Sequence, residues 1–270
     1  MEISELKQIC RQMRRDIINM VADAGCGHPG GSLSCVELVA AAFFNQMKVD
    51  PKNPKNPDRD RFVLSKGHCA PAYYSALAHK GFFPVEELAT LRKLHSRLQG
   101  HPDCKKLPGV DVSTGSLGQG VSLAAGIALG LKHQKKESRV YVLTGDGELQ
   151  EGQIWEAFML ANNYGLDNLT VMIDYNGLQI DGSNDEVMSL GDLSGKLKAF
   201  GFDLIELADG NDIGAVIEAM SKPVVPNKPR CILAHTTKGK GVSFMENQVG
   251  WHGKAPNSEE RAQALKELED

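Results

Sequence analysis

The chain has 270 residues, of which 41% are hydrophobic and 24% charged, a composition typical of a globular protein with a large buried core. Its net charge of −4 gives no electrostatic reason to expect nucleic acid or an anionic membrane as partner, so we expect small-molecule ligands. The amino-terminal segment is amphipathic with both signs of charge, and no stretch is long and apolar enough to span a membrane. Six scattered cysteines without CxxC pairs favour reduced thiols, and we expect a cytoplasmic protein.

Two helices are predicted in the first part of the chain. Apolar residues spaced three and four apart, from Leu6 to Val21, indicate a helix that ends near Gly25. A second helix is predicted to begin at Ser34, because Glu37 follows three residues later as in a capping box. Three prolines within residues 48–60 then predict an irregular surface segment.

Five short apolar runs are predicted to be strands, and segments of helical period separate them. The runs cover residues 61–65, 139–144, 169–174, 202–207 and 230–235. Alternation of buried strands with crossover helices predicts an α/β fold, a parallel sheet with helices on both faces. A charged segment, 258–270, is predicted to be a terminal helix. We expect residues 1–270 to form a single domain.

The segment GDGELQEG, residues 145–152, places Asp146 between two glycines at the end of a predicted strand. Asn176 follows about 30 residues later, the length of one strand–helix–strand unit, so both side chains should meet at the carboxyl edge of the sheet. Carboxylate and amide oxygens suit Mg²⁺, and Gly145 and Gly147 would allow close approach of a diphosphate near a helix that begins at Glu151. The alternative is that Asp146 only caps a helix.

Six motifs spread over nearly the whole chain resemble transketolase, in the same order. They are GHPGGSLS at 27–34, LSKGHCAPAYYSAL at 64–77, QGHPD at 99–103, STGSLGQG at 113–120, GDGELQEGQIWEA at 145–157 and WHGKAPN at 251–257. The resemblance implies the thiamine diphosphate-binding fold, specifically the domain that holds the diphosphate. Ser116 departs from the family pattern, in which proline is frequent at this position.

The resemblance also implies roles for individual residues. Asp146, Asn176 and the carbonyl of Leu178 would hold Mg²⁺, or Ca²⁺ or Mn²⁺ in its place. The other residues expected to bind thiamine diphosphate are His68, Gly145, Gly147 and His252 near the phosphates, and the main chain of Gly115 and Leu117 at the aminopyrimidine. Lys238 and Lys254 match basic residues of the family near the same site, and Lys238 is expected to bind the cofactor. The residues expected to act in catalysis are His28, His101 and His252, which would line the substrate channel and move protons, and Glu151, which would join an acidic network at a subunit interface.

The chemistry of histidine supports the catalytic roles independently of the resemblance. Imidazole titrates near neutrality, so it can accept a sugar hydroxyl proton and return it. Glycine before and proline after place His28 and His101 on turns, where functional side chains concentrate. The other histidines, His79, His95, His133 and His235, are interpreted as ordinary surface or core residues.

The function implied is transfer of a two-carbon ketol unit from a ketose phosphate to an aldose phosphate, as in the pentose phosphate pathway. A complete transketolase has two further domains, one of which supplies the glutamate that activates the aminopyrimidine. We therefore expect this chain to be an N-terminal subunit that is active only with a C-terminal transketolase subunit, in a heterotetramer with two copies of each chain.

Three alternatives remain open on the sequence. The chain could be the α subunit of a decarboxylating 2-oxo acid dehydrogenase, a transketolase for a specialised sugar, or a non-catalytic cofactor-binding subunit. The histidines His28 and His101 favour the sugar enzymes over the first alternative. Cys26 and Cys69 stand beside His28 and His68, and we interpret them as small residues that fill turns rather than as a redox switch.

Overall fold

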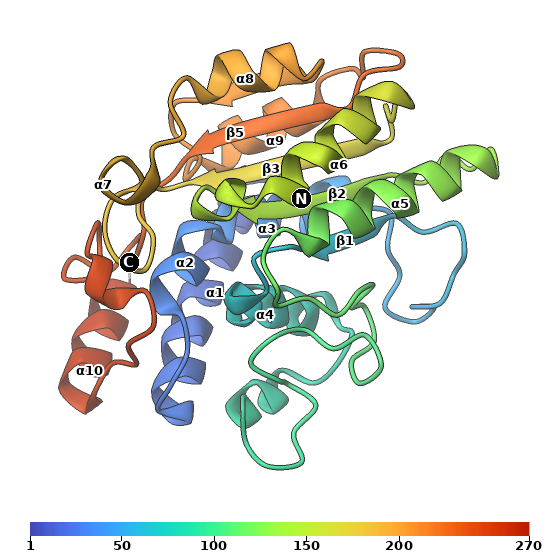
Figure 1. The fold of residues 1–270 in the computed structure, drawn as a ribbon. Helices are drawn as coiled ribbons and strands as arrows, with labels where there is room; N and C mark the ends of the chain where they lie inside the picture. Colours follow the sequence, from blue (N-terminus) through green and yellow to red (C-terminus); the bar gives the residue numbers. More distant parts are fainter. Residues whose placement is uncertain (270) are drawn as a thin grey trace.

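The computed structural model describes residues 1–269, whose arrangement is drawn in Figure 1. The strands are β1 (Arg61–Leu64), β2 (Val140–Gly145), β3 (Leu169–Tyr175), β4 (Asp203–Leu207) and β5 (Arg230–His235). The α-helices are α1 (Ile3–Ala24), α2 (Pro29–Ser34), α3 (Val36–Ala41), α4 (Ala70–Lys80), α5 (Gln119–His133), α6 (Gly152–Asn163), α7 (Asn184–Met188), α8 (Leu193–Ala199), α9 (Ile213–Ser221) and α10 (Ser258–Glu267). Short 3₁₀ segments cover Gly67–Cys69, Val85–Thr90, Gly147–Gln150 and Val249–Trp251, and α3 continues as a π-helical turn over Ala42–Gln46.

All five strands lie parallel in one sheet, in the order β1-β2-β3-β5-β4. Every predicted strand is confirmed. The register sets Gly145 at the end of β2 opposite Asp174 near the end of β3. Because parallel strands all end at the same edge, the turns that follow β1, β2, β3 and β5 are brought together there.

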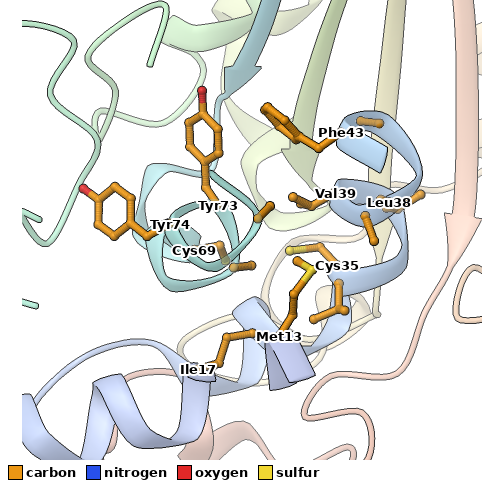
Figure 2. Close-up of a cluster of buried hydrophobic side chains, with 14 of the residues drawn as sticks. Met13, Ile17, Cys35, Leu38, Val39, Phe43, Cys69, Tyr73 and Tyr74 are labelled. Atoms are coloured by element: carbon orange, nitrogen blue, oxygen red, sulfur yellow. The ribbon is translucent and has the colours of Figure 1, made fainter. Parts of the chain in front are cut away.

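Helices cover both faces of the sheet, as predicted, and each face has its own core (Figure 1). Along β2, Tyr141 and Leu143 point into one core, whereas Val140 and Val142 point into the other, which is the alternation expected of a strand. The first core packs under α1, α3, α4 and α9, and part of it is drawn in Figure 2. The second packs under α5, α6 and α8. The α/β fold class is therefore confirmed.

The predicted start of the second helix is wrong. Helix α2 begins at Pro29, where the fixed φ of proline suits a first helical position, and a separate helix follows from Val36. The Ser34 hydroxyl donates to the Asp174 carboxylate at 2.5 Å and does not cap a helix. Glu37 instead accepts two hydrogen bonds, of 2.8 and 2.7 Å, from the buried Arg14 guanidinium. Ser34 and Glu37 thus bind residues that are distant in the sequence instead of forming a capping box.

The remaining boundaries agree with the sequence. Helix α1 ends at Gly25, which has φ of +64° and donates its N–H to the Ala22 carbonyl. Helix α10 begins at Ser258 and is capped by the side chain of Asn257. Within residues 1–269, no helix is long and apolar enough to cross a membrane.

The same substitution at two glycines of α5 is predicted to change the stability of the protein in opposite directions. A Cβ on Gly120 would lie 2.6 Å from the Ser65 Cα, whereas a Cβ on Gly126 would meet nothing within 4 Å. We expect Gly120→Ala to lower the free energy of unfolding by about 1–3 kcal/mol through overpacking. Gly126→Ala should raise it by about 0.5–1 kcal/mol, because alanine favours the helix. Urea denaturation measures both, and equal stability of the two variants would contradict the packing described for α5.

Candidate active site

A pocket of about 220 Å³ opens at the carboxyl edge of the sheet. It lies among the turn after β2, the turn after β3, the loop that precedes α5 and the loop that follows β5. Eleven residues predicted to bind the metal, the cofactor or the substrate line it: His28, His68, Gly115, Leu117, Gly145, Asp146, Gly147, Asn176, Leu178, Lys238 and His252. Residues from seven separate parts of the sequence are therefore assembled at one place.

Asp146 is a buried carboxylate with no lysine or arginine within salt-bridge distance among residues 1–269. It is 2% exposed, and its oxygens accept the N–H groups of Gly147 at 2.8 Å and Gly177 at 2.5 Å. Burial, and then the negative charge of Asp174, raise the pKa of Asp146 to about 6. The hydrogen bond from Gly147 also makes Asp146 the cap of the 3₁₀ segment. Asp146 can therefore cap this segment and still bind a cation. A divalent cation would satisfy this carboxylate.

The other two predicted metal ligands lie in the same pocket. The Asn176 side-chain oxygen accepts the Leu178 N–H at 3.2 Å, and the Leu178 carbonyl accepts a hydrogen bond from Lys238 Nζ at 3.2 Å. One carboxylate, one amide and one carbonyl form an all-oxygen set, which suits a hard cation that completes its shell with phosphate and water. The described residues contain no group of three or more His, Cys, Asp or Glu side chains placed to hold a metal.

The pocket also contains a buried ion pair that the sequence analysis missed. Lys66 lines the pocket and its ammonium binds the Asp174 carboxylate and, at 3.0 Å, the Gly31 carbonyl. Asp174 also accepts hydrogen bonds from the hydroxyl groups of Ser34 and Thr236. Burial opposes the charge of Lys66, but Asp174 overcomes it, and the pKa of Lys66 is raised well above its usual value. The ionised Asp174 is thereby paired with a cation, whereas Asp146 has no positively charged partner among residues 1–269.

Three histidines of the pocket lining form a cluster. The ring centroids of His28, His68 and His252 lie 5.2–5.4 Å apart. Turns hold all three: His28 precedes α2, His68 follows β1, and His252 follows Val249–Trp251. Nδ1 of His28 is buried without a partner among the described residues, and Nδ1 of His252 lies 3.0 Å from Lys238 Nζ.

The expectation of titration near neutrality is wrong for His28 and His252 in the unliganded chain. Burial and then His68 lower the pKa of His28 to about 4, and burial and then Lys238 lower that of His252 to about 3. The pKa of His101 is also lowered, first by burial and then by Arg92. Burial and Lys66 lower the pKa of Lys238 to about 8. The site thus disfavours positive charge on His28, His252 and Lys238, and the imidazoles of His28 and His252 are neutral at pH 7.

Three predicted residues lie outside the pocket lining. His101 is next to it, since a Cβ on Gly115 would lie 3.1 Å from the His101 ring. Glu151 is exposed and occupies the N-cap position of α6 without a side-chain capping bond. The Lys254 ammonium lies 4.2 Å from the Trp251 ring centroid and 2.8 Å from Glu260, so it is held at the surface.

Four further lining residues, Gly31, Glu148, Gln179 and Ile180, were also not predicted. Glu148 stands within the GDGELQEG motif, where its position one turn after Gly145 was a usable signal. The short segment that carries Gly115 and Leu117 is held at β1 because the Thr114 hydroxyl donates to the Leu64 carbonyl at 2.7 Å. A Cβ on Gly67 would lie 2.9 Å from the Gly115 nitrogen, which keeps this loop tight against the pocket.

Comparison with known sequences places this geometry in a family. The sequence model described as "Transketolase, thiamine diphosphate binding domain" matches residues 6–269. An apulose-4-phosphate transketolase subunit of Phocaeicola vulgatus is 42% identical over 271 residues, covering 100% of this chain and 96% of the relative. A 6-deoxy-6-sulfo-D-fructose transketolase subunit of a Clostridium species is 42% identical over 266 residues, covering 98% of this chain and 96% of the relative.

The structural comparison agrees. Transketolase of Pichia stipitis in complex with sedoheptulose 7-phosphate superposes with a TM-score of 0.92 at 34% identity, covering 99% of this chain but 41% of that one. Transketolase of Campylobacter jejuni gives a TM-score of 0.93 at 32% identity, with 99% of this chain and 43% of that one covered. The chain therefore spans less than half the length of these enzymes. It belongs to the transketolase family, as the N-terminal part that forms the thiamine diphosphate-binding domain.

Proposed function

We propose that this chain is the N-terminal subunit of a two-chain transketolase that works with thiamine diphosphate and a divalent cation. The observation that carries the proposal is Asp146, a buried carboxylate without a cation, in a pocket that also gathers Asn176 and the Leu178 carbonyl. Relatives of nearly the same length are named as transketolase subunits rather than as whole enzymes, which supports a division of the enzyme between chains. In this proposal residues 1–270 are one domain.

The cofactor would lie with its diphosphate against the turn after β2. Asp146, Asn176 and the Leu178 carbonyl would hold Mg²⁺, and the narrow turn at Gly145 and Gly147 would admit the phosphates. His68, His252 and Lys238 would face the diphosphate, and the main chain of Gly115 and Leu117 would face the aminopyrimidine. Thiamine diphosphate, when bound, supplies the electron sink for breaking the C2–C3 bond of a ketose.

The histidines would bind and orient the sugar. As neutral imidazoles, His28, His101 and His252 can each donate one hydrogen bond and accept another, which suits sugar hydroxyls. A diphosphate beside His252 would add negative charge and raise the pKa of this histidine toward neutrality. Proton transfer from a sugar hydroxyl would then become accessible in the loaded site rather than in the unliganded chain.

The substrate would be a ketose donor and an aldose acceptor with anionic groups. A transketolase for a specialised sugar is a second candidate, because two similar relatives are named for apulose 4-phosphate and for 6-deoxy-6-sulfo-D-fructose rather than for a common pentose. The α subunit of a 2-oxo acid dehydrogenase is set aside, since the family match is to transketolase. A non-catalytic cofactor-binding subunit remains as an outcome of the experiments below.

A C-terminal transketolase subunit would cover the exposed apolar side chains on α5 and α6. Leu123, Met159, Leu160 and Tyr164 are 38–63% exposed there. Ile180, which lines the pocket, is 64% exposed. A partner chain bound over the pocket and over these apolar side chains would therefore bury them. Exposed Glu151 would face the interface. The partner would supply the activating glutamate and arginines for the anionic end of the sugar, in an assembly of two copies of each chain.

The first prediction concerns the partner. Tagged and captured from its own cell extract, the chain should bring down a second polypeptide of roughly 300 residues. The eluate should form a seven-carbon ketose from xylulose 5-phosphate and ribose 5-phosphate only with Mg²⁺ and thiamine diphosphate. A partner without activity on these pentoses would favour the specialised-sugar candidate. Full activity of the purified chain alone would refute the division between subunits.

The second prediction tests the metal site. Asp146→Asn should weaken binding of magnesium thiamine diphosphate at least about tenfold, because it removes the charge that the cation would neutralise. Isothermal titration calorimetry on the chain, or on its complex with the partner, measures the affinity. Asp181→Asn is the matched control, since Asp181 is exposed and lies outside the pocket lining. Equal loss in both variants would reject Asp146 as the ligand.

The third prediction concerns pH. Because burial raises the pKa of Asp146 from 3.8 to about 6, folding stability falls as the pH rises from 3.8 to 6, and the full cost of the charge is present above pH 6. A cation bound to the ionised carboxylate would recover that cost. Below pH 6 a proton competes with the cation. The magnesium-dependent part of the thermal shift given by thiamine diphosphate, relative to the same experiment in EDTA, should therefore be larger at pH 7.5 than at pH 5.5. A shift that is independent of pH would contradict it.

A further inference from the structure

Glu148 is a buried carboxylate in the pocket wall to which the proposed function gives no role. It is 3% exposed, and no lysine or arginine forms an ion pair with it in the described part of the chain. One oxygen accepts the Ser65 hydroxyl and, at 2.8 Å, the Gly118 N–H. The other accepts the Thr144 hydroxyl at 2.7 Å and the Gly145 N–H at 3.1 Å. Four donors thus converge on a single side chain.

These donors come from parts of the site with different tasks. Gly118 ends the loop of residues 113–118, which contains Gly115 and Leu117. Thr144 and Gly145 lead into the turn of residues 145–147, which contains Asp146. Thr114 and the close approach of Gly67 fix the first half of the loop to the end of β1. Glu148 is the hydrogen-bonded link between the second half of the loop and the turn.

Only a carboxylate fits this position. An ionised carboxylate has acceptor sites on both oxygens, so it can receive two donors on each. A glutamine amide could receive two donors on its oxygen, but its NH₂ group would face the Gly145 N–H, which is also a donor. A hydroxyl group could rotate to accept a hydrogen bond instead, but a backbone N–H cannot. Hydrogen bonds to a buried charge are also stronger than neutral ones, so the link resists opening of either segment.

We propose that Glu148 is a positioning residue that couples the 113–118 loop to the 145–147 turn. This inference rests on the proposed function in one respect: these two segments are taken to face the aminopyrimidine and the diphosphate. The consequence is that a ligand at the turn stiffens the loop through Glu148, even when that ligand does not touch the loop. Binding of a diphosphate at the 145–147 turn would therefore order the 113–118 loop, which is taken to face the aminopyrimidine.

The test is hydrogen–deuterium exchange on the unliganded chain. Glu148→Gln should accelerate exchange about tenfold or more in residues 113–120 and 145–150, because a buried hydrogen bond to a charge is lost at both. Strand β5 and helix α9, which supply none of the four donors to Glu148, should keep their wild-type protection. Glu218→Gln, the same change on the exposed side of α9, is the control and should change neither segment. Unchanged exchange at both segments in Glu148→Gln would overturn the proposal, as would acceleration spread evenly over the chain.

A second variant keeps the test valid if Glu148→Gln does not fold. Thr144→Val removes one of the four donors and retains the buried charge. It should accelerate exchange in the same two segments by a smaller factor. If Thr144→Val leaves both segments as in wild type, the hydrogen-bonded link does not hold them and the proposal fails.

Ligand arms separate this inference from the proposed function. Magnesium diphosphate, which has no aminopyrimidine, should protect residues 145–150 and also 113–120 in the wild-type chain, but only 145–150 in Glu148→Gln. Protection of 113–120 in both proteins would reject Glu148 as the coupling residue. If neither magnesium diphosphate nor magnesium thiamine diphosphate protects any segment of the wild type, cofactor binding by this chain alone fails. The unliganded exchange still decides the role of Glu148 in that case.

Discussion

The pairing of buried charges at the carboxyl edge of the sheet determines which groups of the pocket remain available to a ligand. The Lys66 ammonium and the hydroxyl groups of Ser34 and Thr236 bind Asp174, whereas Asp146 accepts the backbone N–H groups of Gly147 and Gly177 and has no lysine or arginine in salt-bridge distance among residues 1–269. The parallel register that sets Gly145 opposite Asp174 brings the two carboxylates close and gives them different partners. A slip of one residue would turn each side chain to the opposite face and abolish this division.

The same burial gives the site its electrostatic character. Burial is the largest cause of the low pKa values of His28 and His252 and of the lowered pKa of Lys238, and repulsion by neighbouring positive groups adds to it. An anion at this place would relieve their mutual repulsion, while a cation would relieve the cost of ionising Asp146. A magnesium diphosphate carries both features, which is why one ligand suits groups with opposite needs.

The contrast between the predicted and observed second helix shows where local patterns fail. Ser34 and Glu37 have the spacing of a capping box, but both are engaged by residues that are remote in the sequence, Asp174 and Arg14. A cap contributes about 1 kcal/mol, whereas leaving the buried Arg14 without Glu37 would cost about 3–5 kcal/mol. The strands were predicted to within a residue, because a continuous apolar run between turn residues is a local property that burial in a parallel sheet preserves.

The sequence by itself determined the α/β class, the strands, the family resemblance, and eleven residues that meet in the pocket. These follow from apolar periodicity and from glycine, aspartate and histidine in short motifs, which are readable along the chain. Only the tertiary structure decided that Lys66 pairs with Asp174, that Glu148 accepts hydrogen bonds from two segments, that Lys254 is held at the surface, and that His28 and His252 are neutral. Each of these depends on burial and on distances between segments far apart in sequence, and a pKa or an ion pair is set by that environment rather than by the residue type.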